Sequence, residues 1–226
     1  MARENKSLSA MCDLTIVAEG ASRLVGVGRY TGGLREGNKC VWKVFKPAYH
    51  VERDKFFVLD VKAVEKALHI VKRWNSRKFT DVRVSMNKAE VWRFSPGGTR
   101  GGELNLVEPF IHGYQKWNSN SGWADNGNGL DTPAMLQALT HFSYHESGGQ
   151  YVLCDLQGGL YENGDVILTD PVILSMTRSY GVTDLGLKGI RNFFYRHECN
   201  KWCRAWNLPE KMNRYFSASH QTTFEL

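Results

Sequence analysis

The sequence predicts an α+β fold with a β-rich first half and a more helical second half. Short alternating apolar runs, which are typical of strands, recur between residues 14 and 108 and are interrupted by one helical repeat. A strand-like run that ends at Pro109 and is followed by Gly113 marks the expected boundary between the halves. We expect two lobes, residues 13–108 and 114–215, with a hinge at 108–113, a flexible leader (1–12) and a tail (216–226).

Composition restricts the class of protein. The chain has 226 residues, of which 42% are hydrophobic and 12% aromatic, so it can bury a sizeable core. No apolar run approaches the roughly 18 residues of a membrane span, and the polar N-terminus has no apolar signal region. Five cysteines, an odd count, do not suit a secreted disulfide framework. We therefore expect a cytoplasmic protein with reduced thiols and no membrane association.

The charge of the chain points to an anionic partner. The net charge of +6 suits a nucleotide or an acidic protein. No dense Lys/Arg tract is interleaved with aromatic residues, so we expect no nucleic-acid partner.

Glycines and one arginine shape the beginning of the chain. A strand is expected at residues 14–17. Gly20 follows it and could let the backbone approach a phosphate, with Arg23 as a nearby cation. The alternative is a hairpin turn with a surface arginine. Residues 26–39 are rich in glycine but lack a dinucleotide fingerprint, so we expect a flexible connection between strands.

Lys43 lies in the next predicted strand, residues 40–46. Alternation places it on one face with Val41 and Phe45. Two interpretations remain open for a lysine among large apolar neighbours. Its stem could extend to water, or its ammonium group could hold an anion at the end of a cleft.

Periodicity predicts the remaining elements. Apolar residues at helical spacing predict a helix over residues 60–74, and alternation predicts strands near 82–86, 91–94 and 104–108. Thr132 and Pro133 are expected to begin a second helix, which reaches Phe142. Strands at 151–154 and 166–168 are expected to form a hairpin through the turn at 162–165.

Two carboxylates and an amide lie just past strand ends. Asp155 and Gln157 follow one strand, and Asp170 follows the other. One carboxylate could orient or deprotonate a hydroxyl, while the other carboxylate and the amide oxygen could hold Mg²⁺. The alternative is that all three are ordinary turn residues.

Three possible metal ligands lie close together near residue 200. Cys199 and Cys203 are four residues apart and would share one face of a helix, whereas His197 and Cys199 could not both point inward from it. The chain must bend between them, and a metal would explain the bend. A closed tetrahedral zinc site needs a fourth ligand, and a histidine packed with two buried thiols is the alternative. The candidates for the fourth ligand are His141, His145 and Cys154.

The ordered set of motifs resembles the alpha-kinase family, the atypical protein kinases that include myosin heavy chain kinases, elongation-factor-2 kinase and channel-fused kinases. The resemblance covers about residues 13–208. Its most specific parts are the His197, Cys199 and Cys203 spacing and four short motifs: Asn118-Ser119-Asn120-Ser121-Gly122, His141-Phe142-Ser143-Tyr144, Asp155-Leu156-Gln157-Gly158 and Leu168-Thr169-Asp170-Pro171.

The resemblance implies a two-lobed protein-kinase-like fold, with a β-rich N-lobe, a zinc-containing C-lobe and an ATP cleft between them. It also implies roles for residues of this sequence. Those implied to contact ATP are Lys43 at the phosphates, Gly20 and Arg23 over the nucleotide, and Glu108 and Phe110 in the hinge that holds the adenine. Asp155 would face the substrate hydroxyl. The implied metal ligands are Gln157 and Asp170 for Mg²⁺, and His141, His197, Cys199 and Cys203 for a structural zinc.

The resemblance also implies a peptide-binding glycine loop that contains Gly186 and Gly189. The chain departs from the family at Leu174, where a histidine is common, and at Thr183-Asp184, where a Gly-Asn pair is common; Asp184 could alter substrate choice. We expect an ATP- and Mg²⁺-dependent protein kinase that acts on serine or threonine of a protein substrate. The alternative is a kinase-like module that binds nucleotide or a partner without transferring phosphate.

Overall fold

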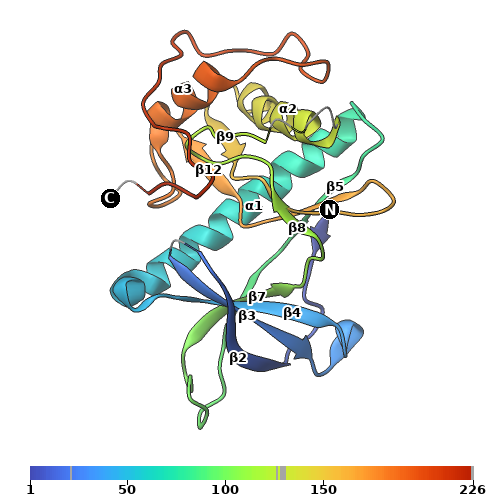
Figure 1. Ribbon diagram of the computed structural model, residues 1–226, viewed down its shortest axis with the longest axis vertical. Coiled ribbons are helices and arrows are strands. Elements are labelled where there is room, and N and C mark those ends of the chain that lie inside the picture. The colour runs from blue at the N-terminus through green and yellow to red at the C-terminus, as the bar shows by residue number, and fades with distance from the viewer. Residues whose placement is uncertain (21, 126, 128–130, 225–226) are drawn as a thin grey trace. The chain divides into compact units, whose positions relative to one another are not determined.

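The computed structural model describes residues 1–20, 22–125, 127 and 131–224 and divides into two compact units (Figure 1). The strand unit comprises residues 2–61 and 87–112, and the mixed unit comprises Met1 and residues 62–86 and 113–226. The mixture of helices and strands confirms the α+β class. Residues 62–86, which sequence assigned to the first lobe, belong to the mixed unit. No helix among the described residues has the length and apolar character needed to cross a membrane.

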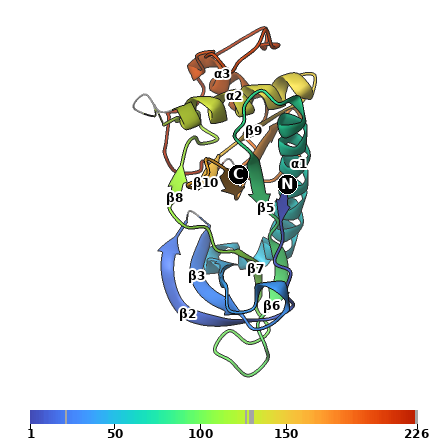
Figure 2. The same cartoon turned by 90° about the vertical axis from the view of Figure 1, so that its right-hand side faces the viewer.

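The strand unit is built on a five-stranded antiparallel sheet of order β2-β3-β4-β7-β6. Figure 2 shows β2 and β3 curving together as a long pair. Gly26 and Gly28 lie inside β3, so the expectation of a flexible connection there was wrong. Gly26 has no side chain to collide with the Trp42 ring, which covers it. The sheet strands are β2 (Ala10–Glu19), β3 (Arg23–Tyr30), β4 (Lys39–Phe45), β6 (Glu90–Arg93) and β7 (Leu104–Pro109).

The first residues of the chain are held by contacts with strands, and β1 (Ala2–Arg3) is the neighbour of the strand at residues 84–87. This short strand is followed by Asn5, which is fully buried and donates a hydrogen bond from Nδ2 to Val107 O (2.9 Å). This part of the expected leader is therefore fixed by tertiary contacts. Two 3-10 helices, Gly33–Arg35 and Pro47–Glu52, complete the unit, and α1 (Arg53–Arg77) begins in it and continues into the mixed unit.

The mixed unit contains two sheets. The strands β5 (Val84–Asn87), β11 (Val166–Thr169), β10 (Gln157–Leu160) and β8 (Tyr114–Lys116) are neighbours in that order, and β12 (Val172–Ser175) pairs with β9 (Tyr151–Cys154). The expected hairpin between residues 151–154 and 166–168 was therefore wrong. The turn at 161–165 joins β10 to β11 instead. Sequence missed β10 because Gly158 and Gly159 weaken its strand pattern.

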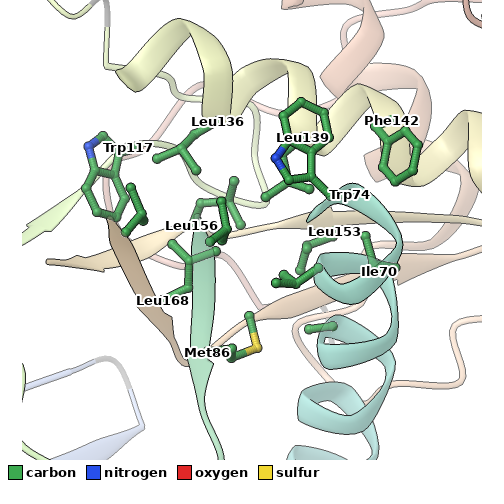
Figure 3. Close-up of a cluster of buried hydrophobic side chains, with 14 of the residues drawn as sticks. Ile70, Trp74, Met86, Trp117, Leu136, Leu139, Phe142, Leu153, Leu156 and Leu168 are labelled. Carbon is green, nitrogen blue, oxygen red and sulfur yellow. The ribbon is translucent and has the colours of Figure 1, made fainter. Parts of the chain in front are cut away.

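Helices cover these sheets. The helix α2 (Asp131–Glu146) packs against β9, and α3 (Gly186–Arg196) packs against β12. Figure 3 shows the main core, in which α1 supplies Ile70 and Trp74 and α2 supplies Leu136, Leu139 and Phe142. The side chains of Leu153, Leu156 and Leu168 meet them from the β9–β11 region. This core holds the loops that follow β9 and β11 in fixed positions.

Gly158 in β10 offers a test of this arrangement. It has φ +152°, a conformation that only glycine adopts readily, and an added methyl group would overlap Ile167 O in the paired strand. We expect Gly158→Ala to cost about 3 kcal/mol of unfolding free energy. Gly164→Ala is the matched control, since Gly164 also has positive φ (+81°) but open space around its Cα, and should cost about 1 kcal/mol. Equal losses in urea unfolding would contradict the predicted clash.

Candidate active site and metal centre

Asp155 lies in a constrained loop directly after β9. Its φ is +59°, a left-handed conformation that aspartate tolerates better than most residues. The next residue is held on both sides: Leu156 N donates to Asn118 Oδ1 (2.8 Å), and Leu156 O accepts from Trp117 N (2.8 Å). These bonds to a second segment of the chain fix the direction of the Asp155 side chain.

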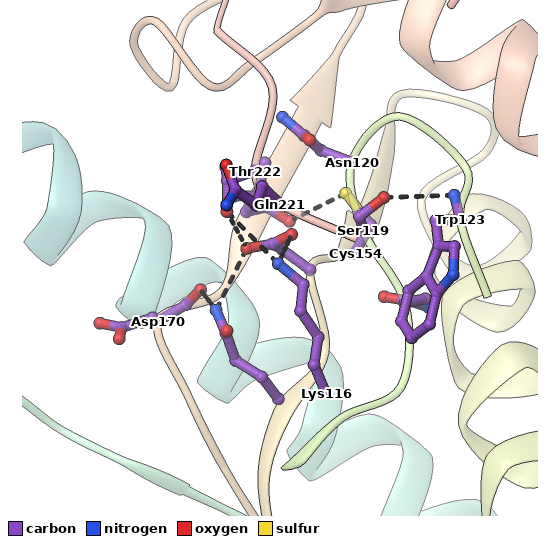
Figure 4. Close-up of polar contacts among 12 residues, drawn as sticks. Lys116, Ser119, Asn120, Trp123, Cys154, Asp170, Gln221 and Thr222 are labelled. Atoms are coloured by element: carbon purple, nitrogen blue, oxygen red, sulfur yellow. Dashed lines mark hydrogen bonds and ion pairs between the residues drawn. The ribbon is translucent and has the colours of Figure 1, made fainter. Parts of the chain in front are cut away.

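The Asp155 carboxylate contacts polar groups of the mixed unit, of which Lys116 and Thr222 are labelled in Figure 4. Oδ1 lies 2.8 Å from Lys116 Nζ, and Oδ2 accepts hydrogen bonds from Thr222 Oγ1 (2.7 Å) and Gln157 Nε2 (3.1 Å). Only 1% of the Asp155 surface is exposed. Burial raises the pKa of the Asp155 carboxyl above its usual value, and Lys116 opposes the rise. A carboxylate in this setting is a good acceptor for a hydroxyl proton.

Gln157 and Asp170 adjoin Asp155 through strand pairing. Gln157 pairs with Thr169 in the β10–β11 register, and its Nε2 also donates to Asp170 O (3.3 Å). Asp170 has φ +46°, and Figure 4 shows its carboxylate pointing away from Thr222 and Lys116. The structure thus brings the three predicted residues together, with the Gln157 amide between the Asp155 carboxylate and the Asp170 backbone carbonyl.

Lys43 and Glu108 form a buried ion pair in the strand unit. Lys43 Nζ lies 2.5 Å from Glu108 Oε1, and Asn87 Nδ2 donates to Glu108 Oε2 (3.2 Å). The exposed fractions of Lys43 and Glu108 are 6% and 3%, so the lysine does not extend to water. Glu108 was expected to be a hinge residue near the adenine, but its side chain points to Lys43 and holds the ammonium in place.

The other residues expected near the nucleotide also lie in the strand unit. Gly20 N donates to Arg23 O (2.9 Å) in the tight turn between β2 and β3. The Arg23 guanidinium pairs with Asp60 and lies 4.8 Å from the centre of the Phe45 ring. Phe110 N donates to Lys39 O (3.2 Å), and Phe110 O accepts from Arg3 Nη2 (3.0 Å). Its backbone groups are therefore already bonded within the unit.

The four predicted zinc ligands converge. One ligand atom from each of His141, His197, Cys199 and Cys203 lies within 4.8 Å of the others. His197 Nε2 is 3.2 Å from His141 Nδ1, Cys199 Sγ is 3.7 Å from His141 Nδ1, and Cys203 Sγ is 3.5 Å from His197 Nε2. The other two candidates for the fourth position point elsewhere: Cys154 donates to Val172 O, and His145 accepts from Asn207 N.

The local backbone differs from the expected one. α3 ends at Arg196, and His197 has an extended conformation (φ −76°, ψ 123°), so the chain does bend before Cys199. Cys199 and Cys203 do not lie on a helix, which was the expectation; they flank a turn in which Cys203 N donates to Asn200 O (2.9 Å). A turn can aim two thiols at one point as well as a helical face can.

The chemistry of the cluster suits a cation. His141 Nε2 lies 3.0 Å from Asn207 O, a contact that places the proton on Nε2 and the lone pair on Nδ1, which faces the cluster. Burial lowers the pKa of His141, and burial together with His141 lowers the pKa of His197 to about 4. Both imidazoles are thus neutral at pH 7. Burial also raises the pKa of the Cys203 thiol to about 11, so its thiolate needs a neighbouring cation.

The predicted glycine loop and its neighbour have structural roles. Gly186 and Gly189 lie in the first turn of α3, so the expectation of a loop there was wrong. Asp184 is fully buried, and its carboxylate accepts hydrogen bonds from Ser175 N (2.8 Å), Ser175 Oγ (2.6 Å) and Gly186 N (3.0 Å). It ties β12 to α3 and is not exposed to a peptide.

Sequence reasoning missed Lys116 and Thr222, which both contact Asp155. Lys116 lies opposite Gln157 in the β8–β10 register, and no local pattern distinguishes it from a surface lysine. Thr222 belongs to the tail, 67 residues from Asp155, and has no recognisable motif around it. Asn118 was part of a quoted motif, but its role in holding the Asp155 loop required the structure.

Comparison with known proteins defines the class. The family model described as the alpha-kinase family matches residues 18–203. The chain therefore belongs to the alpha-kinase family, which consists of atypical protein kinases.

Among solved structures, the C-terminally truncated alpha-kinase domain of myosin heavy chain kinase matches with a TM-score of 0.73 and 26% identity, over 89% of this chain and 90% of that chain. An alpha kinase from Entamoeba histolytica has the same fold, with a TM-score of 0.73 and 21% identity, over 95% of this chain and 84% of that chain. The alpha-kinase domain of myosin-II heavy chain kinase A, solved in complex with AMP-PNP, matches with a TM-score of 0.71.

Curated relatives are much longer than this chain. Alpha-protein kinase vwkA of Dictyostelium discoideum is 41% identical over 107 residues, which are 45% of this chain and 16% of vwkA. Eukaryotic elongation factor 2 kinase of Caenorhabditis elegans is 36% identical over 151 residues, 58% of this chain and 18% of that kinase. The human elongation factor 2 kinase is 40% identical over 110 residues, which are 48% of this chain and 14% of that kinase. The matched regions thus span less than a fifth of these relatives.

Proposed function

We propose that this chain is an ATP- and Mg²⁺-dependent serine/threonine protein kinase of the alpha-kinase type, with residues 13–215 as its catalytic domain. The observation that carries the proposal is the grouping of Asp155, Gln157 and Asp170 where the paired strands β10 and β11 meet their adjoining loops, with Asp155 accepting a hydrogen bond from a hydroxyl. Family membership and a relative solved with AMP-PNP support it. A cytoplasmic location belongs to the same proposal and is supported by five free cysteines.

Asp155 would orient the acceptor hydroxyl and take its proton. Phosphoryl transfer depends mainly on positioning and charge stabilisation, because its loose transition state leaves the protein little covalent chemistry to do. In the strand unit, Lys43 would hold the ATP phosphates. The ion pair with Glu108 would hold its ammonium group in position. Gly20, Arg23, Glu108 and Phe110 belong to the same proposed nucleotide-binding set.

Gln157 and Asp170 would hold Mg²⁺. The oxygen atoms of both residues suit this role. Gln157 Nε2 donates to the Asp155 carboxylate and to Asp170 O, which leaves Oε1 as the Gln157 atom that would bind a cation. The Asp170 carboxylate points away from the positively charged Lys116. Hard cations such as Mg²⁺ prefer oxygen ligands, and Mg²⁺ neutralises phosphate charge when bound.

We expect Asp170→Asn to weaken Mg²⁺-dependent activity more than Gln157→Ala does, because it removes a formal charge. The measurement is the Mg²⁺ concentration that gives half-maximal phosphorylation at saturating ATP, which should rise about tenfold or more for Asp170→Asn. Asp165→Asn, at the exposed β10–β11 turn, is the control. Full activity of the wild type in excess EDTA would contradict the assignment.

The His141, His197, Cys199 and Cys203 cluster would hold one structural zinc ion. In a tetrahedral site with bonds of about 2.1 Å to nitrogen and 2.3 Å to sulfur, ligand atoms lie about 3.3–3.8 Å apart. Three of the six distances between ligand atoms, 3.2, 3.5 and 3.7 Å, are close to that geometry, and all six are within 4.8 Å. Four protein ligands leave no position for water, so zinc would supply cross-linking and not substrate chemistry.

The general test uses radiolabelled ATP, Mg²⁺ and a panel of acceptor proteins that include helical ones. We expect label on serine or threonine of at least one acceptor, identified by phosphoamino-acid analysis. Nucleotide binding without transfer to any acceptor would favour the alternative, a kinase-like binding module.

A further inference from the structure

We propose that Arg3 is a positioning residue for the nucleotide. It acts on Lys43 through a series of buried polar groups and also holds the backbone carbonyls at the end of β7. The inference rests on the proposed function, because that proposal assigns Lys43 to the ATP phosphates. The residues of the series all lie in the strand unit: Arg3, Asn87, Glu108 and Lys43.

The Arg3 guanidinium donates to acceptors close to the end of β7. Nη1 lies 3.0 Å from Asn87 Oδ1 and 3.2 Å from Pro109 O, and Nη2 lies 3.0 Å from Phe110 O. The Arg3 backbone is itself fixed, since its O accepts a hydrogen bond from Lys88 N (3.0 Å). A guanidinium presents its donors in a rigid planar fork, so it can hold acceptors from separate segments in one arrangement.

Asn87 connects Arg3 to Glu108. Its Nδ2 donates to Glu108 Oε2 (3.2 Å) and to Pro109 O (2.8 Å), and only 1% of its surface is exposed. A guanidinium has only donors and an ionised carboxylate has only acceptors. One orientation of the amide therefore satisfies both neighbours, with Oδ1 toward Arg3 and Nδ2 toward Glu108. Arg3 thus stabilises the direction in which Asn87 donates.

Glu108 in turn holds the Lys43 ammonium group. Glu108 Oε1 lies 2.5 Å from Lys43 Nζ, and both residues are buried. Buried polar groups are costly to leave without partners, so the members of such a network keep one another in place. Without the Arg3 guanidinium, the buried Asn87 amide can turn, and the Glu108 carboxylate and the Lys43 ammonium can move with it. Lys43 would then be less well positioned for the ATP phosphates before ATP binds.

The same guanidinium fixes the backbone of the expected hinge. Phe110 O accepts from Arg3, and Phe110 N donates to Lys39 O (3.2 Å). Pro109 has no N–H group, and its carbonyl accepts from both Arg3 and Asn87. Arg3 therefore touches the segment proposed to hold the adenine and, through Asn87, the lysine proposed to hold the phosphates.

The test measures ATP affinity by titration calorimetry, with Mg²⁺ present, for Arg3→Met, Lys43→Met and the double variant. We expect Arg3→Met to weaken ATP binding about tenfold, as the loss of a charge-assisted hydrogen bond does, and to raise KM for ATP more than it lowers kcat. Arg3→Met should weaken binding less when Lys43→Met is already present, because residues of one network do not contribute additively. A purely structural role would lower Tm and leave the affinity of the folded protein unchanged.

Arg35→Met is the matched control. Arg35 Nε donates to Glu4 O (2.7 Å), so this arginine also binds the backbone of the N-terminal segment, but at a residue outside the series from Arg3 to Lys43. We expect Arg35→Met to bind ATP as wild type does. Arg3→Lys keeps the charge and lacks the fork, so its ATP affinity should lie between those of wild type and Arg3→Met. It carries the comparison if Arg3→Met is insoluble.

The outcomes separate this inference from the proposed function. If Lys43→Met binds ATP weakly and the Arg3 variant binds it as wild type does, the inference is wrong and the kinase assignment stands. Full additivity of the Arg3 and Lys43 substitutions would overturn the route through Lys43. If wild type binds no ATP, or if Lys43→Met binds it as tightly as wild type, the proposed function itself fails.

Discussion

Asp155→Ala is expected to lower the turnover of an added serine/threonine acceptor by about 10²–10⁴-fold, the usual contribution of a general base. The substitution removes a carboxylate that the structure places against both a hydroxyl and a lysine. The loss should appear mainly in kcat, because Lys43 and the other proposed nucleotide-binding residues lie in the strand unit and are unchanged. Initial rates measured over a range of ATP concentrations separate the change in kcat from any change in KM for ATP.

The interpretation requires that the variant is folded. Removing Asp155 leaves Lys116, whose side chain is 8% exposed, without its carboxylate partner, and this can destabilise the protein. Asp155→Asn keeps the shape of the side chain and removes its basicity, so it serves as the second variant. Asp165→Asn, in the turn between β10 and β11 and half-buried, is the control for loss of a charge. Turnover within a few-fold of wild type for a folded Asp155→Asn would remove Asp155 from the catalytic role.

Cys203→Ala is expected to give insoluble or heat-labile protein. Structural zinc contributes about 10–16 kcal/mol in small zinc peptides, but this unit has its own apolar core, so we expect a smaller loss, of about 4 kcal/mol. For a chain of this length that loss lowers Tm by about 8–16 °C. Cys203→Ala should destabilise the protein because the cluster joins α2, through His141, to the segment after α3.

Metal analysis and a matched cysteine variant test this prediction. Purified wild type should contain about one zinc per chain, and removal by a chelator should lower Tm as Cys203→Ala does. Cys12→Ala is the control, since Cys12 is a free, half-buried cysteine in the strand unit, and should cost about 1 kcal/mol. Metal-free protein with a normal Tm would restore the interpretation of a histidine packed with buried thiols.

Local periodicity predicted the individual elements better than their partners. Alternation correctly placed Lys43 in a strand on the face of Phe45, because side-chain direction follows from the strand itself. The pairing of β9 was wrong, since both β11 and β12 are short apolar runs that would satisfy β9 equally well in sequence. The glycines of β10 concealed this strand, which lies between β9 and β11 in the sequence. The choice between partners is made by the packing of α2 and α3 and is not encoded within any short segment.

In the candidate metal cluster, too, the local sequence predicted part of the arrangement and the packing of the helices decided the rest. The spacing of His197, Cys199 and Cys203 predicted that the chain bends before Cys199, because steric geometry prevents a helix from pointing both His197 and Cys199 inward. Spacing alone left the fourth residue open among three candidates, and only the family resemblance pointed to His141. His141 is selected because α2 runs beside the segment after α3, while Cys154 faces the apolar cluster under α3.

The sequence by itself determined which reactive groups this protein carries: Lys43, the Asp155, Gln157 and Asp170 set, and four ligands suited to zinc. Only the tertiary structure decided what faces them. Lys116 and Thr222 meet at Asp155 from positions 39 residues before it and 67 residues after it. A hydrogen bond across such separations depends on the whole intervening path, which here is fixed by the β8–β10 register and by Asn120 and Asn192 holding the tail. No local pattern carries that information, because each of these bonds forms only after the elements have packed.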